Sequence, residues 1–214
     1  MAASYTIYLG ILCIIAILGV GSFKKFTTPF RLLVLSIAYI LIHEVVVHNW
    51  KALSINTASA YILYAMISPI VVCLVCYLAL TSKFARRGVL WIVTALLIID
   101  IFYLAYAPLE PFPSNLIRLS TPCFIFAGLL LLWQSLNSDF ATPLGKKSIF
   151  VFSLAFINYS VLTFTHLTLY CVVLKTGTAK VLSQEIHTYI SCLYYLILGY
   201  SLWLDAKQYR RDTN

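Results

Sequence analysis

Apolar residues fill the chain in seven long runs, and short polar segments separate one run from the next. Each run has about 18–25 residues, which is enough for an α-helix to cross roughly 30 Å of hydrocarbon. A backbone N–H or C=O without a partner in hydrocarbon costs several kcal/mol, so such runs are expected to be helical. The pattern predicts an all-α membrane bundle in one domain, residues 1–214, with spans at residues 4–23, 31–50, 58–81, 88–107, 114–136, 148–174 and 181–204.

The composition supports this class of protein. Of the 214 residues, 62% are hydrophobic and 10% are charged, whereas soluble domains average about 45–50% apolar and about 25% charged residues. The net charge of +8 is compatible with nucleic-acid binding when it is taken alone. The basic residues, however, form short clusters between the apolar runs, which is typical of cytoplasmic loops and argues against a nucleic-acid partner.

The basic residues also predict the orientation of the bundle. No basic residue precedes the first run and Lys24 and Lys25 follow it, an order opposite to that of a cleavable signal peptide, so we expect a retained helix. The bias of cytoplasmic loops towards Lys and Arg then places the N-terminus outside and the C-terminus inside the cell (inner or plasma) membrane. Eleven of the fifteen basic residues fall on the predicted inner side, where they would meet anionic lipid head groups: Lys24, Lys25, Arg31, Lys83, Arg86, Arg87, Lys146, Lys147, Lys207, Arg210 and Arg211.

Ionisable residues inside the predicted spans are concentrated in the outer half of the membrane. Glu44 lies 13 residues after Arg31, roughly 20 Å above the inner boundary at 1.5 Å per residue, and Asp100 has a similar depth. All four histidines and Arg118 are predicted at or above this level. Because an intramembrane ionisable group is costly, it is a candidate functional residue, and we take Glu44 and Asp100 as the candidate catalytic acids.

Polar residues at helical spacing extend this candidate site. Glu44 and His48 are four residues apart and share one face of the second helix. Polar residues on the third, sixth and seventh helices are spaced three or four apart and would face a pocket open to the outside, although such residues often only hydrogen-bond neighbouring helices. The candidate ligand-binding residues are His43, His48, Tyr64, Arg118, Asn158, Tyr159, His166, Glu185, His187 and Tyr194.

The first functional hypothesis is a sensory or binding module for a small amphiphilic, lipid-like ligand. Tyr, His and carboxylate side chains in an outward-facing pocket would recognise the ligand, and the bundle would relay its presence to the basic inner face. The inner loops are too short for an output domain, so this hypothesis requires a cytoplasmic or membrane signalling partner.

Two further hypotheses remain open. In an intramembrane enzyme, His48, His166 and His187 would ligate zinc with Glu44 or Asp100 as general base, or one of these acids would protonate an isoprenoid-like substrate. In a proton-coupled transporter the same groups would form a relay, but the inner half offers few polar residues to complete a path.

A short motif in the first inner loop adds a resemblance. The pattern Lys-Lys-x-Thr-x-Pro-x-Arg followed by a late glutamate resembles small seven-helix bacterial integral membrane proteins, here through Lys24, Lys25, Thr28, Pro29, Arg31 and Glu44. The resemblance implies the seven-helix topology and no particular activity. The seventh run has no lysine in mid-span, which excludes a retinal Schiff base of the rhodopsin kind.

Overall fold

The computed structural model describes residues 3–49, 57–106, 114–137, 143–172 and 177–212. Over these ranges the chain is all-helical, with one short 3-10 helix and no strand, as the sequence predicts. The elements are α1 (Ala3–Gly21), η1 (Phe23–Lys25), α2 (Thr28–His48), α4 (Thr57–Ala79), α5 (Lys83–Tyr106), α6 (Ser114–Asn137), α7 (Pro143–Val172) and α8 (Gly177–Asp212).

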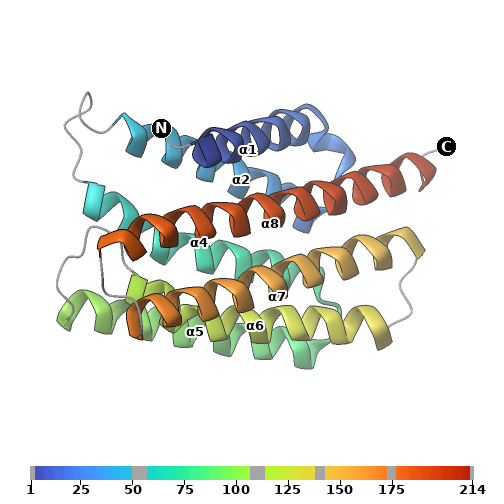
Figure 1. Ribbon diagram of the computed structural model, residues 1–214. Coiled ribbons are helices and arrows are strands. Elements are labelled where there is room, and N and C mark those ends of the chain that lie inside the picture. Colours follow the sequence, from blue (N-terminus) through green and yellow to red (C-terminus); the bar gives the residue numbers. More distant parts are fainter. Residues whose placement is uncertain (1–2, 50–56, 107–113, 138–142, 173–176, 213–214) are drawn as a thin grey trace.

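The helices lie roughly parallel and antiparallel to one another, with the two chain termini at opposite ends of the bundle (Figure 1). Six described helices, α1, α2 and α4 to α7, are long and apolar enough to cross a membrane. Large apolar side chains on their outer faces are exposed, including Ile17, Trp91 and Phe102. An exposed apolar surface of this kind fits contact with lipid tails.

The longest helix, α8 with 36 residues, is not one of these six candidate spans. Its central part carries Ser191, Tyr194, Tyr195 and Ser201, all buried, and these side chains lower its hydropathy. They are buried because α8 packs closely against α7 and α1, across the front of the bundle in Figure 1. Part of the polarity of α8 therefore lies on an inner face of the bundle, whereas Tyr189 and Tyr200 are exposed.

Several helix ends differ from the predicted spans. α5 begins at Lys83, five residues before the predicted start, and α8 continues to Asp212, well beyond residue 204. Pro29 lies in the first turn of α2, where its missing N–H has no helical acceptor to lose. A helix can continue beyond the hydrocarbon layer into water. Hydropathy therefore predicts the membrane-spanning part of a helix and not the residues at which the helix begins and ends. The predicted ends at residues 50, 107 and 174 lie outside the described residues.

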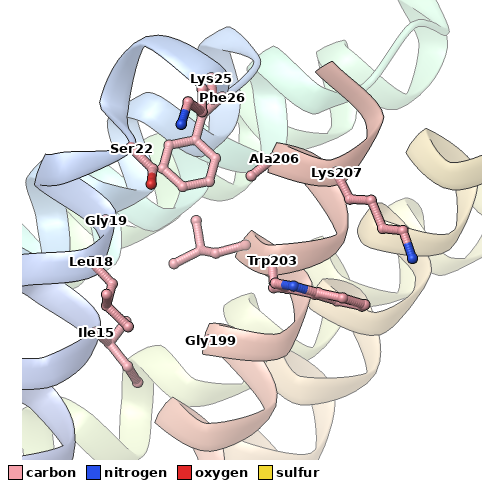
Figure 2. Close-up of a pocket in the computed structure, with 11 residues that line it drawn as sticks. Ile15, Leu18, Gly19, Ser22, Lys25, Phe26, Gly199, Trp203, Ala206 and Lys207 are labelled. Atoms are coloured by element: carbon pink, nitrogen blue, oxygen red, sulfur yellow. The ribbon is translucent and has the colours of Figure 1, made fainter. Parts of the chain in front are cut away.

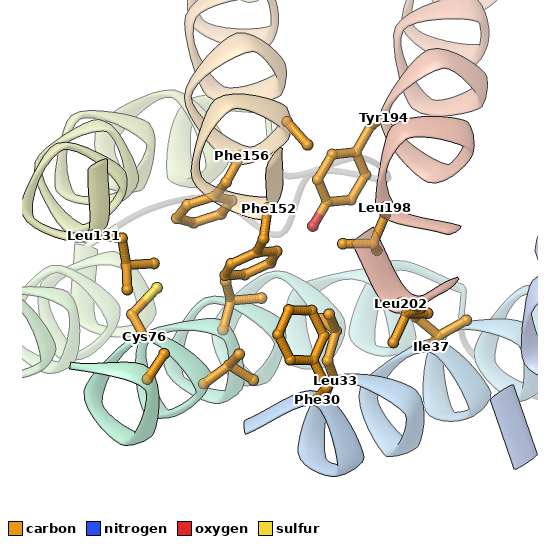
Figure 3. Packing of buried hydrophobic residues seen from close by; sticks show 14 of the residues in the cluster. Phe30, Leu33, Ile37, Cys76, Leu131, Phe152, Phe156, Tyr194, Leu198 and Leu202 are labelled. Atoms are coloured by element: carbon orange, nitrogen blue, oxygen red, sulfur yellow. The ribbon is translucent and has the colours of Figure 1, made fainter. Parts of the chain in front are cut away.

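The main hydrophobic core runs along the middle of the bundle. Aromatic and aliphatic side chains from α2, α4, α6, α7 and α8 meet there, as Figure 3 shows for Phe30, Leu131, Phe152 and Leu198. The rings of Phe30 and Phe152 contact edge to face, with centroids 6.0 Å apart. A second, smaller core of Ile62, Ala65, Tyr103 and Leu116 joins α4, α5 and α6.

The end of the bundle that holds the C-terminus also holds the clustered lysines and arginines, and we call it the basic end. Gln134 of α6 is fully buried there and fixes the α4–α5 connection. Its Oε1 accepts hydrogen bonds from Thr81 N at 2.6 Å, Thr81 Oγ1 at 3.2 Å and Ser82 N at 3.3 Å, and its Nε2 donates to the Ala79 carbonyl at 3.1 Å. One amide side chain thus satisfies backbone groups that α4 and α5 leave without helical partners.

A second polar contact at the basic end joins α8 to the α1–α2 connection. The carboxylate of Asp205 accepts hydrogen bonds from Thr27 N at 2.8 Å and from Thr27 Oγ1 at 3.1 and 3.2 Å. Asp205 is almost completely buried, and this burial raises its pKa to about 6, while the bonds from Thr27 act in the opposite direction. Residues 178 positions apart in the sequence are therefore held together at this end.

Candidate functional site

The candidate site is built around Glu44, one turn before the C-terminal end of α2. Tyr5 and Tyr8 of α1 are three residues apart, so both side chains project from one face of that helix towards α2. The Tyr5 hydroxyl donates to Glu44 Oε2 at 2.9 Å, and the Tyr8 hydroxyl donates to Oε1 at 3.2 Å. Each carboxylate oxygen thus has one tyrosine donor, and the carboxylate is half-buried.

His48 lies one turn beyond Glu44 on the same face of α2, as its spacing predicts. Its ring lies against that of Tyr5, with centroids 5.9 Å apart. Unlike Glu44, His48 is exposed. The Tyr5 side chain therefore contacts both a carboxylate and an imidazole at the end of the bundle opposite to the basic end.

His43 points to the neighbouring helix α4. Its ring is buried, stacks on Tyr64 with centroids 4.6 Å apart, and meets Tyr61 edge-on at 5.6 Å. Its Nε2 lies 3.1 Å from the Ala60 carbonyl oxygen, which can only accept, so this nitrogen carries the proton. Tyr61 and Tyr64 are three residues apart on α4, so both rings face His43. We call these seven residues the Glu44 cluster: Tyr5, Tyr8, His43, Glu44, His48, Tyr61 and Tyr64.

A chain of aromatic rings connects this cluster to α7 and α8. Tyr8 contacts Tyr195 with centroids 5.9 Å apart, and Tyr195 contacts Tyr194 at 5.1 Å. Tyr194 then packs on Tyr159 of α7 at 4.6 Å, and Tyr159 contacts His187 at 6.3 Å. All four separations lie in the range in which aromatic pairs attract each other. The structure thus brings Tyr159, His187 and Tyr194 of the sequence prediction into one aromatic system with Tyr8, the donor to Glu44.

Other predicted site residues lie elsewhere. Asp100 is buried on α5 one turn from Tyr103 of the second core, and α5 packs on α4 and α6, whereas α2 packs on α1 and α4. Within the described residues, no hydrogen bond or ring contact joins Asp100 or Arg118 to Glu44. Asn158 is exposed and donates to the Leu154 carbonyl of its own helix at 2.9 Å. The two acids of the prediction therefore occupy opposite sides of α4.

The predicted zinc ligands are divided between two parts of the bundle. His166 on α7 and His187 on α8 belong to two helices that pack against each other, whereas His48 contacts Tyr5 of α1. Glu185 is half-buried near the beginning of α8. Among the described side chains, no three His, Cys, Asp or Glu residues gather in a metal-binding arrangement.

Many buried hydroxyls outside the cluster are satisfied within their own helix. Ser120, Ser135, Ser153 and Ser201 each donate to a carbonyl three or four residues earlier, at 2.7–3.1 Å. Such bonds are the ordinary way in which a helix accommodates a buried serine. These serine hydrogen bonds stay within one helix, whereas the hydrogen bonds of Glu44 join different helices.

The sequence reasoning did not identify Tyr5 and Tyr8 as site residues. They carry no charge and lie near the start of an apolar run, where tyrosine is common as an interfacial residue. The available signal was their three-residue spacing at the outer end of the first span, at the depth predicted for Glu44. No family model matches the chain, and no curated protein or solved structure shows significant similarity to it.

Proposed function

We propose that the protein crosses the cell (inner or plasma) membrane seven times, with its N-terminus outside and its C-terminus inside. The support is the set of six apolar helices, together with α8, which is long enough to span and buries Ser191, Tyr194, Tyr195 and Ser201 in the bundle. The lysines and arginines of the α1–α2 and α4–α5 connections lie at the basic end, which fits the cytoplasmic side. The Glu44 cluster then lies in the outer half of the membrane.

The orientation is testable by cysteine labelling in intact cells. Asn49→Cys places a thiol at the end of α2 beside the Glu44 cluster, and Lys24→Cys places one at the basic end. A membrane-impermeant thiol reagent should label the first without permeabilisation and the second only after it. The wild-type protein measures the background from its natural cysteines, and the reverse pattern would contradict the proposal.

The Glu44 cluster supports binding of a small amphiphile with a polar head group that donates hydrogen bonds. A carboxylate offers about four acceptor positions, and Tyr5 and Tyr8 occupy one on each oxygen. The remaining positions of a half-buried carboxylate suit a donor or a cationic group of a ligand. The surrounding tyrosine and histidine rings offer apolar faces to its hydrocarbon part and attract a cation. The single observation that carries the proposal is this carboxylate between two tyrosine hydroxyls inside an apolar bundle.

The aromatic chain gives the cluster a route to the opposite end, as a sensory module requires. Tyr8, Tyr195 and Tyr194 couple the site to α8, which extends to the basic end and there holds the α1–α2 connection through Asp205 and Thr27. A ligand that changes the packing of Tyr8 would shift α8 against α1. A cytoplasmic or membrane partner would then respond to the basic end.

The ligand can be sought in the protein as it is purified from its membrane. Molecules extracted from the wild-type protein in a mild detergent should include an amphiphile enriched over the bulk membrane lipids, identified by mass spectrometry. Glu44→Gln removes the charge and keeps the shape, so the enrichment should fall. Equal enrichment in wild type and Glu44→Gln would contradict the proposed function.

A further inference from the structure

A groove at the basic end lies between α1 and α8, remote from the Glu44 cluster. It encloses about 380 Å³, which is in the range of small-molecule sites. Gly199 lines it on the α8 side, where an added Cβ would lie 3.3 Å from the Ile15 side chain, so the lack of a side chain there leaves room between the two helices. Figure 2 shows Leu18 and Ile15 on the α1 side of this space and Trp203 on the α8 side.

The apolar part of the groove faces the outside of the bundle. The Leu18 side chain is 65% exposed and Trp203 is 53% exposed. In the proposed topology this surface meets lipid tails, because α1 is a membrane-spanning helix. The groove therefore opens sideways into the hydrocarbon and suits an acyl chain better than a water-soluble ligand.

The polar part of the groove is cationic. Lys25 of η1 and Lys207 of α8 line it together with the Ser22 hydroxyl. The Lys207 ammonium lies 4.8 Å from the centre of the Trp203 ring, a cation–π contact that leaves its charge in place. The nearest acid along α8, Asp205, is committed to three hydrogen bonds from Thr27.

We propose that this groove binds one anionic glycerophospholipid from the surrounding leaflet. Its phosphate would be held by Lys25, Lys207 and Ser22, and one acyl chain would lie along Ile15 and Leu18. The two lysines that line the groove favour an anionic head group over a zwitterionic one, because no acid is among the described residues that line the groove beside them. The apolar wall favours a lipid over free phosphate. Basic pockets between helices on the cytoplasmic side are known to suit such head groups. The lipid would bridge the α1–α2 connection and α8, the same two segments that Asp205 and Thr27 join.

Native mass spectrometry of the detergent-purified full chain tests this proposal. The probes are phosphatidylglycerol and phosphatidylcholine with identical acyl chains. Wild type should retain one phosphatidylglycerol with at least about fivefold higher affinity than phosphatidylcholine. Lys25→Gln with Lys207→Gln should abolish this preference, whereas Lys25→Arg with Lys207→Arg should keep it.

A matched control removes two lysines of the basic end that do not line the groove, Lys83→Gln with Lys146→Gln. This pair should retain the preference for phosphatidylglycerol, and a loss equal to that of the groove pair would overturn the proposal, as would equal binding of both lipids by wild type. Thermal unfolding in detergent checks that each variant is folded, and phosphatidylglycerol should raise the midpoint of wild type and not of the groove glutamine pair. Glu44 does not line the groove, so Glu44→Gln should keep the preference for phosphatidylglycerol over phosphatidylcholine, and the two proposals fail separately.

Discussion

The Tyr8 hydroxyl lies 3.2 Å from Oε1 of Glu44, and this contact joins α1 to α2 near the end of the bundle opposite to the basic residues. Tyr8 is buried, so removal of its hydroxyl leaves a carboxylate oxygen without this donor. The same tyrosine ring contacts Tyr195 of α8. A single side chain therefore connects the one acid of the Glu44 cluster to the aromatic chain.

Tyr8→Phe should lower the free energy of unfolding by about 1 kcal/mol, because hydrogen bonds between membrane helices contribute about 0.6 kcal/mol and bonds to charged groups contribute more. Thermal unfolding in detergent measures the change. Tyr200→Phe is the control, since Tyr200 is exposed on α8 and stacks on Trp203. In a double-mutant cycle with Glu44→Gln the two changes should not add, and full additivity would show that the bond contributes nothing.

Gln134→Leu should destabilise the protein by about 2–4 kcal/mol, because it removes the partner of several buried backbone groups of the α4–α5 connection. The side chains have similar volume, so a loss of stability reports hydrogen bonding more than packing. Asn137→Leu is the matched control, since Asn137 is exposed and bonds only the Trp133 carbonyl of its own helix. Similar unfolding midpoints for the two variants would contradict the role given to Gln134.

Gly128→Ala should destabilise the contact between α6 and α7. A Cβ at residue 128 would lie 2.6 Å from Cγ1 of Ile157, so the Ile157 side chain or one of the two helices must shift to accommodate it. Overpacking of this kind costs about 1–3 kcal/mol. Gly10→Ala is the control, because a Cβ there meets nothing within 4 Å, and this variant should be as stable as wild type or slightly more stable. Equal unfolding midpoints for Gly128→Ala and wild type would show that α6 and α7 do not pack this closely.

The buried carboxyl of Asp205 should make stability depend on pH. Its pKa rises from 3.8 in the unfolded chain to about 6 in the folded protein, so the folded state binds the proton more tightly. This group therefore favours folding below about pH 4 and ceases to do so as the pH rises through 6. Asp205→Asn keeps an acceptor for Thr27 and removes the titration.

Unfolding midpoints of wild type and Asp205→Asn, measured from pH 4 to pH 7, test this expectation. The variant should gain stability relative to wild type as the pH rises, with the change concentrated between about pH 4 and 6. A constant difference between the two proteins across this range would show that the Asp205 pKa is not raised.

The helical class and most segment positions could be predicted because hydrocarbon restricts the chain to long apolar helices. The helix ends were less accurate, as at Lys83 and Asp212, because a helix continues into water without a change in its hydrogen bonding. The seventh predicted segment lies within α8, which is not one of the six candidate spans, so its membrane crossing stays a prediction. Depth along the membrane can be counted from residue numbers, and this count made Glu44 a candidate site residue.

The rotation of each helix about its own axis, and which helices pack against each other, could not be predicted from one sequence. Asp100 shares the predicted depth of Glu44 but lies on the other side of α4, and Asn158 is exposed on α7. Tyr8 was missed because its role depends on α1 packing beside α2 and α8. The histidines were predicted as ligand-binding or zinc-binding residues, yet three of them contact tyrosine rings. His48 contacts Tyr5, His43 contacts Tyr64 and His187 contacts Tyr159.

The most direct test of the proposed function compares two carboxylates of equal predicted depth. The affinity of the purified protein for the amphiphile extracted with it should fall about tenfold in Glu44→Gln, as for one lost charged hydrogen bond. In Asp100→Asn, on the other side of α4, the affinity should remain that of wild type. Unchanged binding in Glu44→Gln, or an equal loss in both folded variants, would contradict a ligand site at Glu44.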